Sequence, residues 1–211
     1  LFQAIAFITG GSLGDYGNFR KRGLVLASTV GASACCLFFL LPISASMYWV
    51  GGLLIMISNV SLGVSVVFYN SYLPLMVEDC AEVVDAIEQD KQGLLPQDAV
   101  HKAREAANSE ISSKGQMWGY VGGTSCLIIS VIAVFITTTL GMSTWWSFGV
   151  ASSISGFWWQ FFSMQAFKRL PERPGPEAPK NINLLLQGWI RTYKLIKHLS
   201  LVSPNTNYFL L

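Results

Sequence analysis

The residues of this 211-residue sequence that could bind a small solute are polar side chains inside long apolar stretches. Asn59 lies near the middle of one stretch, and Tyr69, Asn70 and Gln160 lie toward the ends of two stretches. A polar group in an apolar environment costs free energy unless it faces a partner or a water-filled cavity. We therefore expect these four side chains along a substrate pathway, although hydrogen bonds between helices would explain them equally well.

Catalytic chemistry is not indicated. The two histidines, His101 and His198, lie in separate polar segments without a paired nucleophile, acid or base motif. The four cysteines show neither a metal-ligand spacing nor a disulfide framework. We expect no catalytic residue, no metal and no cofactor, and the pattern disfavours a membrane enzyme.

The charged residues are segregated along the chain. All 26 fall within residues 15–22, 78–114 and 168–197, and the intervals 23–77 and 115–167 contain none. Each interval is long enough for two membrane-spanning helices of about 20 residues joined by a tight turn. Two crossings return the chain to the same side, so all 14 Lys and Arg residues face one compartment, which the positive-inside bias identifies as the cytosol.

The composition agrees with this reading. The chain is 52% hydrophobic and only 12% charged, which is about half the charge of a soluble domain. Because the basic residues flank apolar stretches, they orient spans and do not indicate a nucleic-acid partner. The sequence therefore predicts an all-α fold, a polytopic transmembrane helix bundle that lies in the lipid bilayer.

The expected organisation is a bundle followed by a linker. Residues 1–167 form part of an N-terminal transmembrane bundle with a cytosolic loop at 78–114, and residues 168–206 form a cytosolic linker. Within the linker, residues 184–200 alternate apolar and basic side chains at helical spacing, which predicts an amphipathic helix on the membrane surface. The expected spans are 1–14 (the back half of a truncated helix), 23–41, 48–69, 116–137 and 145–166, with 207–211 as the start of another.

A glycine stripe marks the span at residues 116–137. Gly115, Gly119 and Gly123 recur every four residues and therefore share one helix face. Without side chains there, a neighbouring helix can approach closely. The stripe predicts helix packing in a compact bundle.

Three segments resemble known sequences. Residues 11–22 contain glycines, small residues, Asp15 and a basic cluster, which is similar to the signature between helices two and three of the major facilitator superfamily. Here Gly17 follows Asp15 by two positions, and Phe19 stands where that signature has its first basic residue. The string Asp-Tyr-Gly-Asn-x-Arg-Lys-Arg, with residues 68–74 and 112–123, resembles the autophagy-related vacuolar amino-acid effluxer family.

This resemblance covers about residues 10–125 and implies a bundle of the major facilitator type that is incomplete at both ends. The four complete spans would be helices three to six of a twelve-helix transporter whose C-terminal half is missing. Residues 1–14 would be the end of helix two, and residues 207–211 the entry to helix seven. The implied function is a permease of the vacuolar membrane that exports amino acids, of the neutral class, to the cytosol by alternating access after autophagic breakdown. The alternative is a non-transporting membrane scaffold or receptor that binds partners through its cytosolic loops.

The position of Asp15 beside the basic residues Arg20, Lys21 and Arg22 suggests a cytosolic gate. A carboxylate beside guanidinium groups at a helix end can hold neighbouring helices together in one state and release them in another. The alternative is that the basic cluster only sets the orientation of the spans.

Overall fold

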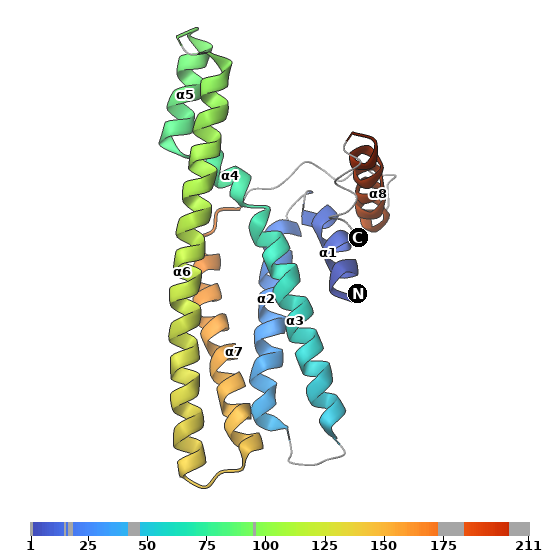
Figure 1. The fold of residues 1–211 in the computed structure, drawn as a ribbon, viewed down its shortest axis with the longest axis vertical. Coiled ribbons are helices and arrows are strands. Elements are labelled where there is room, and N and C mark those ends of the chain that lie inside the picture. The colour runs from blue at the N-terminus through green and yellow to red at the C-terminus, as the bar shows by residue number, and fades with distance from the viewer. Residues whose placement is uncertain are drawn as a thin grey trace.

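The computed structural model describes residues 2–14, 16, 19–41, 47–94, 96–172 and 184–202. These residues form helices and no strand, and the expected all-α membrane bundle is confirmed (Figure 1). The helices are α1 (Phe2–Gly14), α2 (Phe19–Leu37), the 3-10 turn η1 (Phe38–Leu40), α3 (Tyr48–Asn70), α4 (Leu73–Glu78), α5 (Ala81–Lys91), α6 (Gln97–Thr139), α7 (Thr144–Arg169) and α8 (Leu184–Val202).

Within the described ranges, three helical segments are long and apolar enough to cross a membrane: Phe19–Leu40, Tyr48–Glu78 and Asp98–Thr139. Helix α7 has 26 residues, but its tryptophans, serines and glycines lower its hydropathy. It nevertheless lies along both α2 and α6 in the bundle (Figure 1). A count of four complete spans stays a prediction.

Helix α6 differs from the expected pattern of a loop at 78–114 followed by a separate span at 116–137. It is one continuous helix of 43 residues, whose first part projects beyond the bundle beside α5 (Figure 1). No proline interrupts residues 97–139, and Gly115 costs a helix interior only about 1 kcal/mol. The helix therefore continues through the polar-to-apolar boundary and ends before Gly141, whose φ of +79° permits the predicted turn into α7.

The projecting hairpin of α5 and α6 has a small apolar core of its own. Val83, which is fully buried, packs with Val77 and Ala107. Arg104 Nε lies 2.9 Å from Glu78 Oε1 at the base of the hairpin. This packing holds α5 and the first part of α6 together as a helical extension of the bundle.

Helices α2 and α7 approach each other closely through small residues. A Cβ atom on Gly156 of α7 would lie 2.7 Å from the carbonyl oxygen of Ala32 and 2.9 Å from Cys35 Cβ. Ser153 Oγ donates a hydrogen bond to the carbonyl oxygen of Cys36 at 3.1 Å. Backbone contact of this kind is typical of membrane helices, where small side chains permit dense packing.

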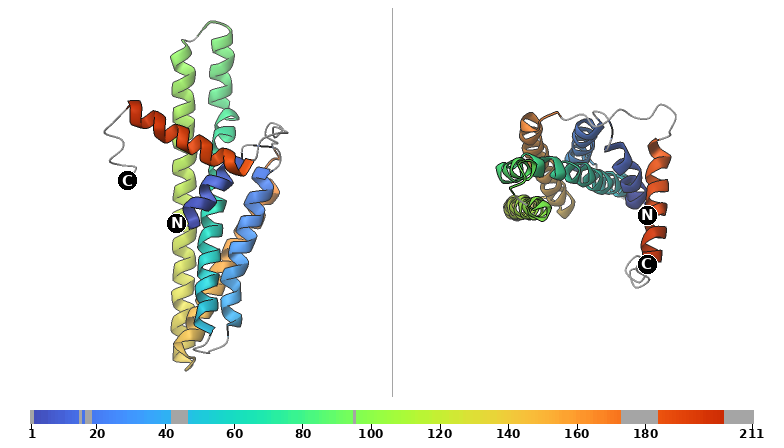
Figure 2. Two further views of the ribbon diagram at one scale, coloured as in Figure 1. Left: turned by 90° about the vertical axis from the view of Figure 1, so that its right-hand side faces the viewer. Right: turned by 90° about the horizontal axis from the view of Figure 1, so that it is seen from above.

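Helix α8 runs across the bundle axis and packs beside α1, at the far edge from α6 (Figure 2). This arrangement is compatible with the predicted surface helix at 184–200, although the lipid surface itself stays a prediction. Asp15, most of the Pro-rich part of the linker and the predicted helix start at 207–211 lie outside the described residues.

Candidate functional site

A large groove separates two pairs of helices. Helix α3 packs on α2 and helix α6 packs on α7, and α2 and α7 lie behind α3 and α6 in the view of Figure 1. The residues that line the groove come from all four of these helices, with α3 and α6 on its two sides. Its volume is about 1550 Å³. A space of this size at the level of the membrane helices can hold a small solute or a packed side-chain layer.

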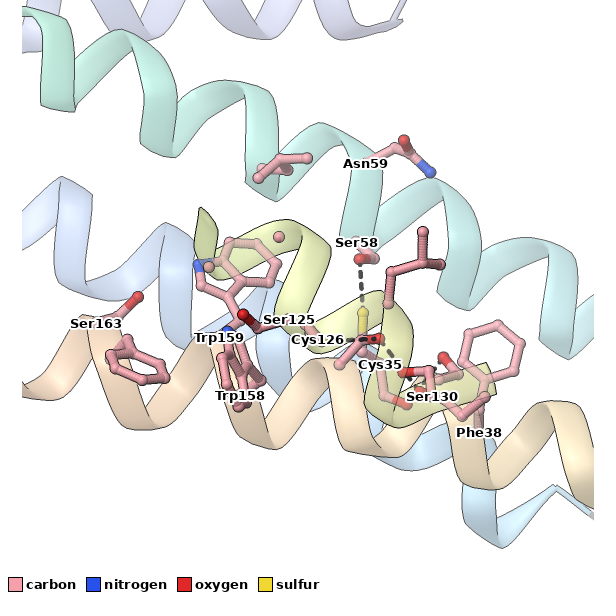
Figure 3. A pocket seen from close by; sticks show the side chains of 18 of the residues that line it. Cys35, Phe38, Ser58, Asn59, Ser125, Cys126, Ser130, Trp158, Trp159 and Ser163 are labelled. Carbon is pink, nitrogen blue, oxygen red and sulfur yellow. Dashed lines mark hydrogen bonds between the residues drawn. The ribbon is translucent and has the colours of Figure 1, made fainter. Parts of the chain in front are cut away.

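The groove wall is uncharged. Its polar side chains are serines on three helices, two cysteines and Asn59, and the rest of the lining is glycine, aliphatic and aromatic (Figure 3). Cys35 Sγ lies 3.0 Å from Ser58 Oγ, and Cys126 Sγ donates to Ser155 Oγ at 3.7 Å. The hydroxyl of Ser130 is buried and has no hydrogen-bond partner among the described residues. Such a surface can accept or donate hydrogen bonds without holding a fixed charge.

The predicted pathway residues do not form one cluster. Asn59 lines the groove, and its Nδ2 donates to the carbonyl oxygen of Ile55 at 3.0 Å within α3. Tyr69 lies half exposed near the C-terminal end of α3, where its hydroxyl would be 3.0 Å from a Cβ atom on Gly115. Asn70 is exposed at the end of the same helix.

Gln160 lies away from the groove. It is four residues after Gly156 on α7 and shares its α2-facing side. Its Oε1 atom is buried without a hydrogen-bond partner in the described part of the chain. The roles of Asn59, Tyr69, Asn70 and Gln160 as substrate contacts stay predictions.

The glycine stripe faces the groove in part. A Cβ atom on Gly119 or Gly123 would meet nothing within 4 Å among the described residues. Both glycines line the groove, together with Gly122. If another helix packs closely on this stripe, as predicted, that helix must come from outside the described residues.

Sequence analysis missed the serines of α6 and α7. Ser152 and Ser155 on α7, and Ser125 and Ser130 on α6, line the groove. Serine forms local hydrogen bonds to its own helix, so a serine in an apolar segment does not by itself indicate a cavity. The spacing of three residues between Ser152 and Ser155, which places both on one face, was the available signal.

The basic cluster at the start of α2 contacts several other segments. Lys21 Nζ donates to the carbonyl oxygen of Leu170 at 2.9 Å and lies 3.6 Å from Glu172 Oε1. The Arg20 guanidinium lies 5.5 Å from the centre of the Tyr72 ring. A lysine that satisfies a carbonyl at a helix end stabilises that end. The cluster therefore joins the start of α2 to the end of α7, and its action as a gate with Asp15 stays a prediction.

Comparison with known proteins identifies the family. The family model described as "Vacuole effluxer Atg22 like" matches residues 1–211. The chain belongs to the Atg22 family. The chain is accordingly part of a multi-pass integral protein of the vacuolar membrane.

Several fungal members of the Atg22 family are similar over most of this chain. Autophagy-related protein 22 of Neurospora crassa is 31% identical over 87% of the chain and 29% of the relative. The protein of the same name from Chaetomium globosum is 29% identical over 85% of the chain and 32% of the relative. The chain thus spans about a third of the length of these curated relatives. No solved structure matches it.

Tyr16 connects the segment at residues 11–22 of this Atg22-family chain to helix α8. Its hydroxyl donates to Gln187 Oε1 at 3.3 Å and accepts a hydrogen bond from Arg191 Nη2 at 2.9 Å. The Arg191 guanidinium also lies 5.8 Å from the centre of the Tyr16 ring. These contacts hold α8 against α1.

We expect Tyr16→Phe to loosen α8, because it removes two hydrogen bonds worth about 1 kcal/mol each. Hydrogen–deuterium exchange of residues 184–202 in the full-length protein should become about tenfold faster or more. Tyr193→Phe is the control, since that side chain lies exposed on α8. Equal exchange in the Tyr16 variant and the unaltered protein would contradict this role.

Proposed function

We propose that this chain is part of a permease that exports neutral amino acids from the vacuole to the cytosol by alternating access. The uncharged groove between α3 and α6, in a member of a vacuole effluxer family, carries the proposal. Helices of the polypeptide outside these 211 residues would close the open side of the groove. This sharing of a central site between parts of one chain is how many transporters are built.

The side chains that line the groove would contact only the uncharged part of a substrate. No Asp, Glu, Lys, Arg or His is among the groove-lining residues in the described part of the chain. A fixed charge is costly at this depth, so this surface suits the uncharged side chain of a substrate. The partners of the ammonium and carboxylate groups would come from helices elsewhere in the protein.

The test is amino-acid retention in isolated vacuoles from cells that lack the complete protein. We expect neutral amino acids to accumulate selectively, because their exit route is missing. Reintroducing the complete protein with Asn59→Leu should restore export only in part, whereas the unaltered protein should restore it fully. An unchanged amino-acid pool in the deletion cells would contradict the permease and favour the scaffold alternative.

A further inference from the structure

A second groove lies on the outer face of α2 at its cytosolic end. It has a volume of about 530 Å³ and combines cationic and apolar side chains. The face of α2 that carries it is separate from the close packing of Gly31 against Trp159 and Ser61. The residues that line it are Lys21, Arg22, Val25, Leu26, Thr29, Tyr72 and Glu172.

The polar and apolar parts of this groove are ordered along the helix axis. Arg22 is seven residues before Thr29, which at 1.5 Å per residue corresponds to about 10 Å along α2. Helix α2 is long and apolar enough to cross a membrane, and its charged residues lie at its N-terminal end, which the positive-inside bias assigns to the cytosol. In a bilayer Arg22 would therefore lie at headgroup depth, and Leu26 would lie deeper. Leu26 is 67% exposed, so this apolar surface is available to lipid.

The two cations are not equivalent. Lys21 is already bound to the Leu170 carbonyl oxygen and paired with Glu172. Arg22 is exposed and forms no hydrogen bond or ion pair within the described ranges. Glu172 offsets the charge of Lys21, which leaves the Arg22 guanidinium as the uncompensated cation of the groove. A guanidinium matches the geometry of a phosphate through two parallel hydrogen bonds.

We propose that this groove binds an anionic glycerophospholipid of the cytosolic leaflet. The phosphate lies on Arg22, and an acyl chain follows Val25, Leu26 and Thr29. The order of one cation followed by an apolar strip toward the membrane interior is the order of headgroup and chain in such a lipid. Binding at this groove does not depend on what the protein transports.

Lipid binding is measured by native mass spectrometry of the full-length protein in the presence of phosphatidylserine or phosphatidylcholine with identical acyl chains. We expect more phosphatidylserine than phosphatidylcholine on the unaltered protein. Arg22→Gln should lower the bound phosphatidylserine about fivefold, because one basic residue near an anionic lipid surface has an effect of this size. Arg22→Lys, which keeps the charge, should retain most of the binding.

The matched control is Lys91→Gln at the end of α5, which removes one positive charge outside the groove. An equal loss with Lys91→Gln would overturn the proposal, since it would indicate a general charge effect. Unchanged binding with Arg22→Gln would also overturn it. Displacement of the lipid by inorganic phosphate at equal concentration would indicate a site for free anions instead. If Arg22→Gln does not fold, Leu26→Trp tests the same groove by filling it, and undiminished lipid binding would then contradict the proposal.

Discussion

Gly156→Leu is expected to disrupt the bundle, because α7 contacts the α2 backbone at this position. The substituted Cβ atom would lie 2.7 Å from the carbonyl oxygen of Ala32 and 2.8 Å from Cys36 Sγ. A backbone carbonyl cannot rotate away as a flexible side chain can, so the helices must separate. Overpacking of this kind costs about 1–3 kcal/mol or more.

Helix separation would also lengthen the hydrogen bonds from Ser152 and Ser153 to the carbonyl oxygens of α2. Each hydrogen bond between membrane helices contributes about 0.6 kcal/mol. We therefore expect a total loss of about 2–4 kcal/mol from the steric contact and the two weakened hydrogen bonds together. The full-length variant should accumulate poorly and show a markedly lower melting temperature in detergent.

The control for this prediction is Gly52→Leu on α3. Gly52 is exposed, and a Cβ atom there would meet nothing within 4 Å among the described residues. Leucine also favours a helix over glycine by about 0.8 kcal/mol, so this variant should melt at or above the temperature of the unaltered protein. A normal melting temperature for Gly156→Leu would refute the close contact of α2 and α7.

Much of the fold was accessible from the sequence, because membrane helices leave a strong compositional signal. The uncharged intervals indicated the apolar helices, and the length of the interval 115–167 predicted a tight turn within it, which the structure places at Gly141. The sequence did not predict in the same way that residues 97–139 form one continuous helix. A solvated helix and a membrane helix have different patterns, and only the lack of a helix breaker between them indicates continuity.

The site was less accessible than the fold, because a glycine or a serine has the same sequence pattern in a packed interface and in an open groove. Gly31 and Gly119 both belong to small-residue repeats, at 23, 27 and 31 and at 115, 119 and 123. A Cβ atom on Gly31 would meet Trp159 and Ser61, whereas one on Gly119 would meet nothing within 4 Å in the described part of the chain. Asn59 was recognisable because an amide is rare in an apolar helix, and it does line the groove. Gln160 had the same signal but faces α2, since its direction depends on how α7 is rotated.

Gly119→Leu is expected to separate folding from transport. Within the described residues the leucine side chain has open space at this position, so the packing of α6 on α7 should be preserved. The side chain would, however, project into the groove between α3 and α6. If the groove is a solute path closed by further helices, the leucine either blocks the path or keeps those helices apart.

Export of neutral amino acids by the complete protein should therefore fall by tenfold or more, which corresponds to a rise of about 1.4 kcal/mol in the activation free energy of transport. The measurement is efflux from vacuoles that contain the variant at the level of the unaltered protein, verified by quantitative immunoblotting. Gly52→Leu again serves as the control, since Gly52 is on α3 but does not line the groove. Normal efflux with Gly119→Leu would show that the groove is neither a solute path nor a contact for moving helices. Loss of the protein itself would instead indicate that the glycine stripe is a static packing surface, as the spacing of Gly115, Gly119 and Gly123 alone suggests.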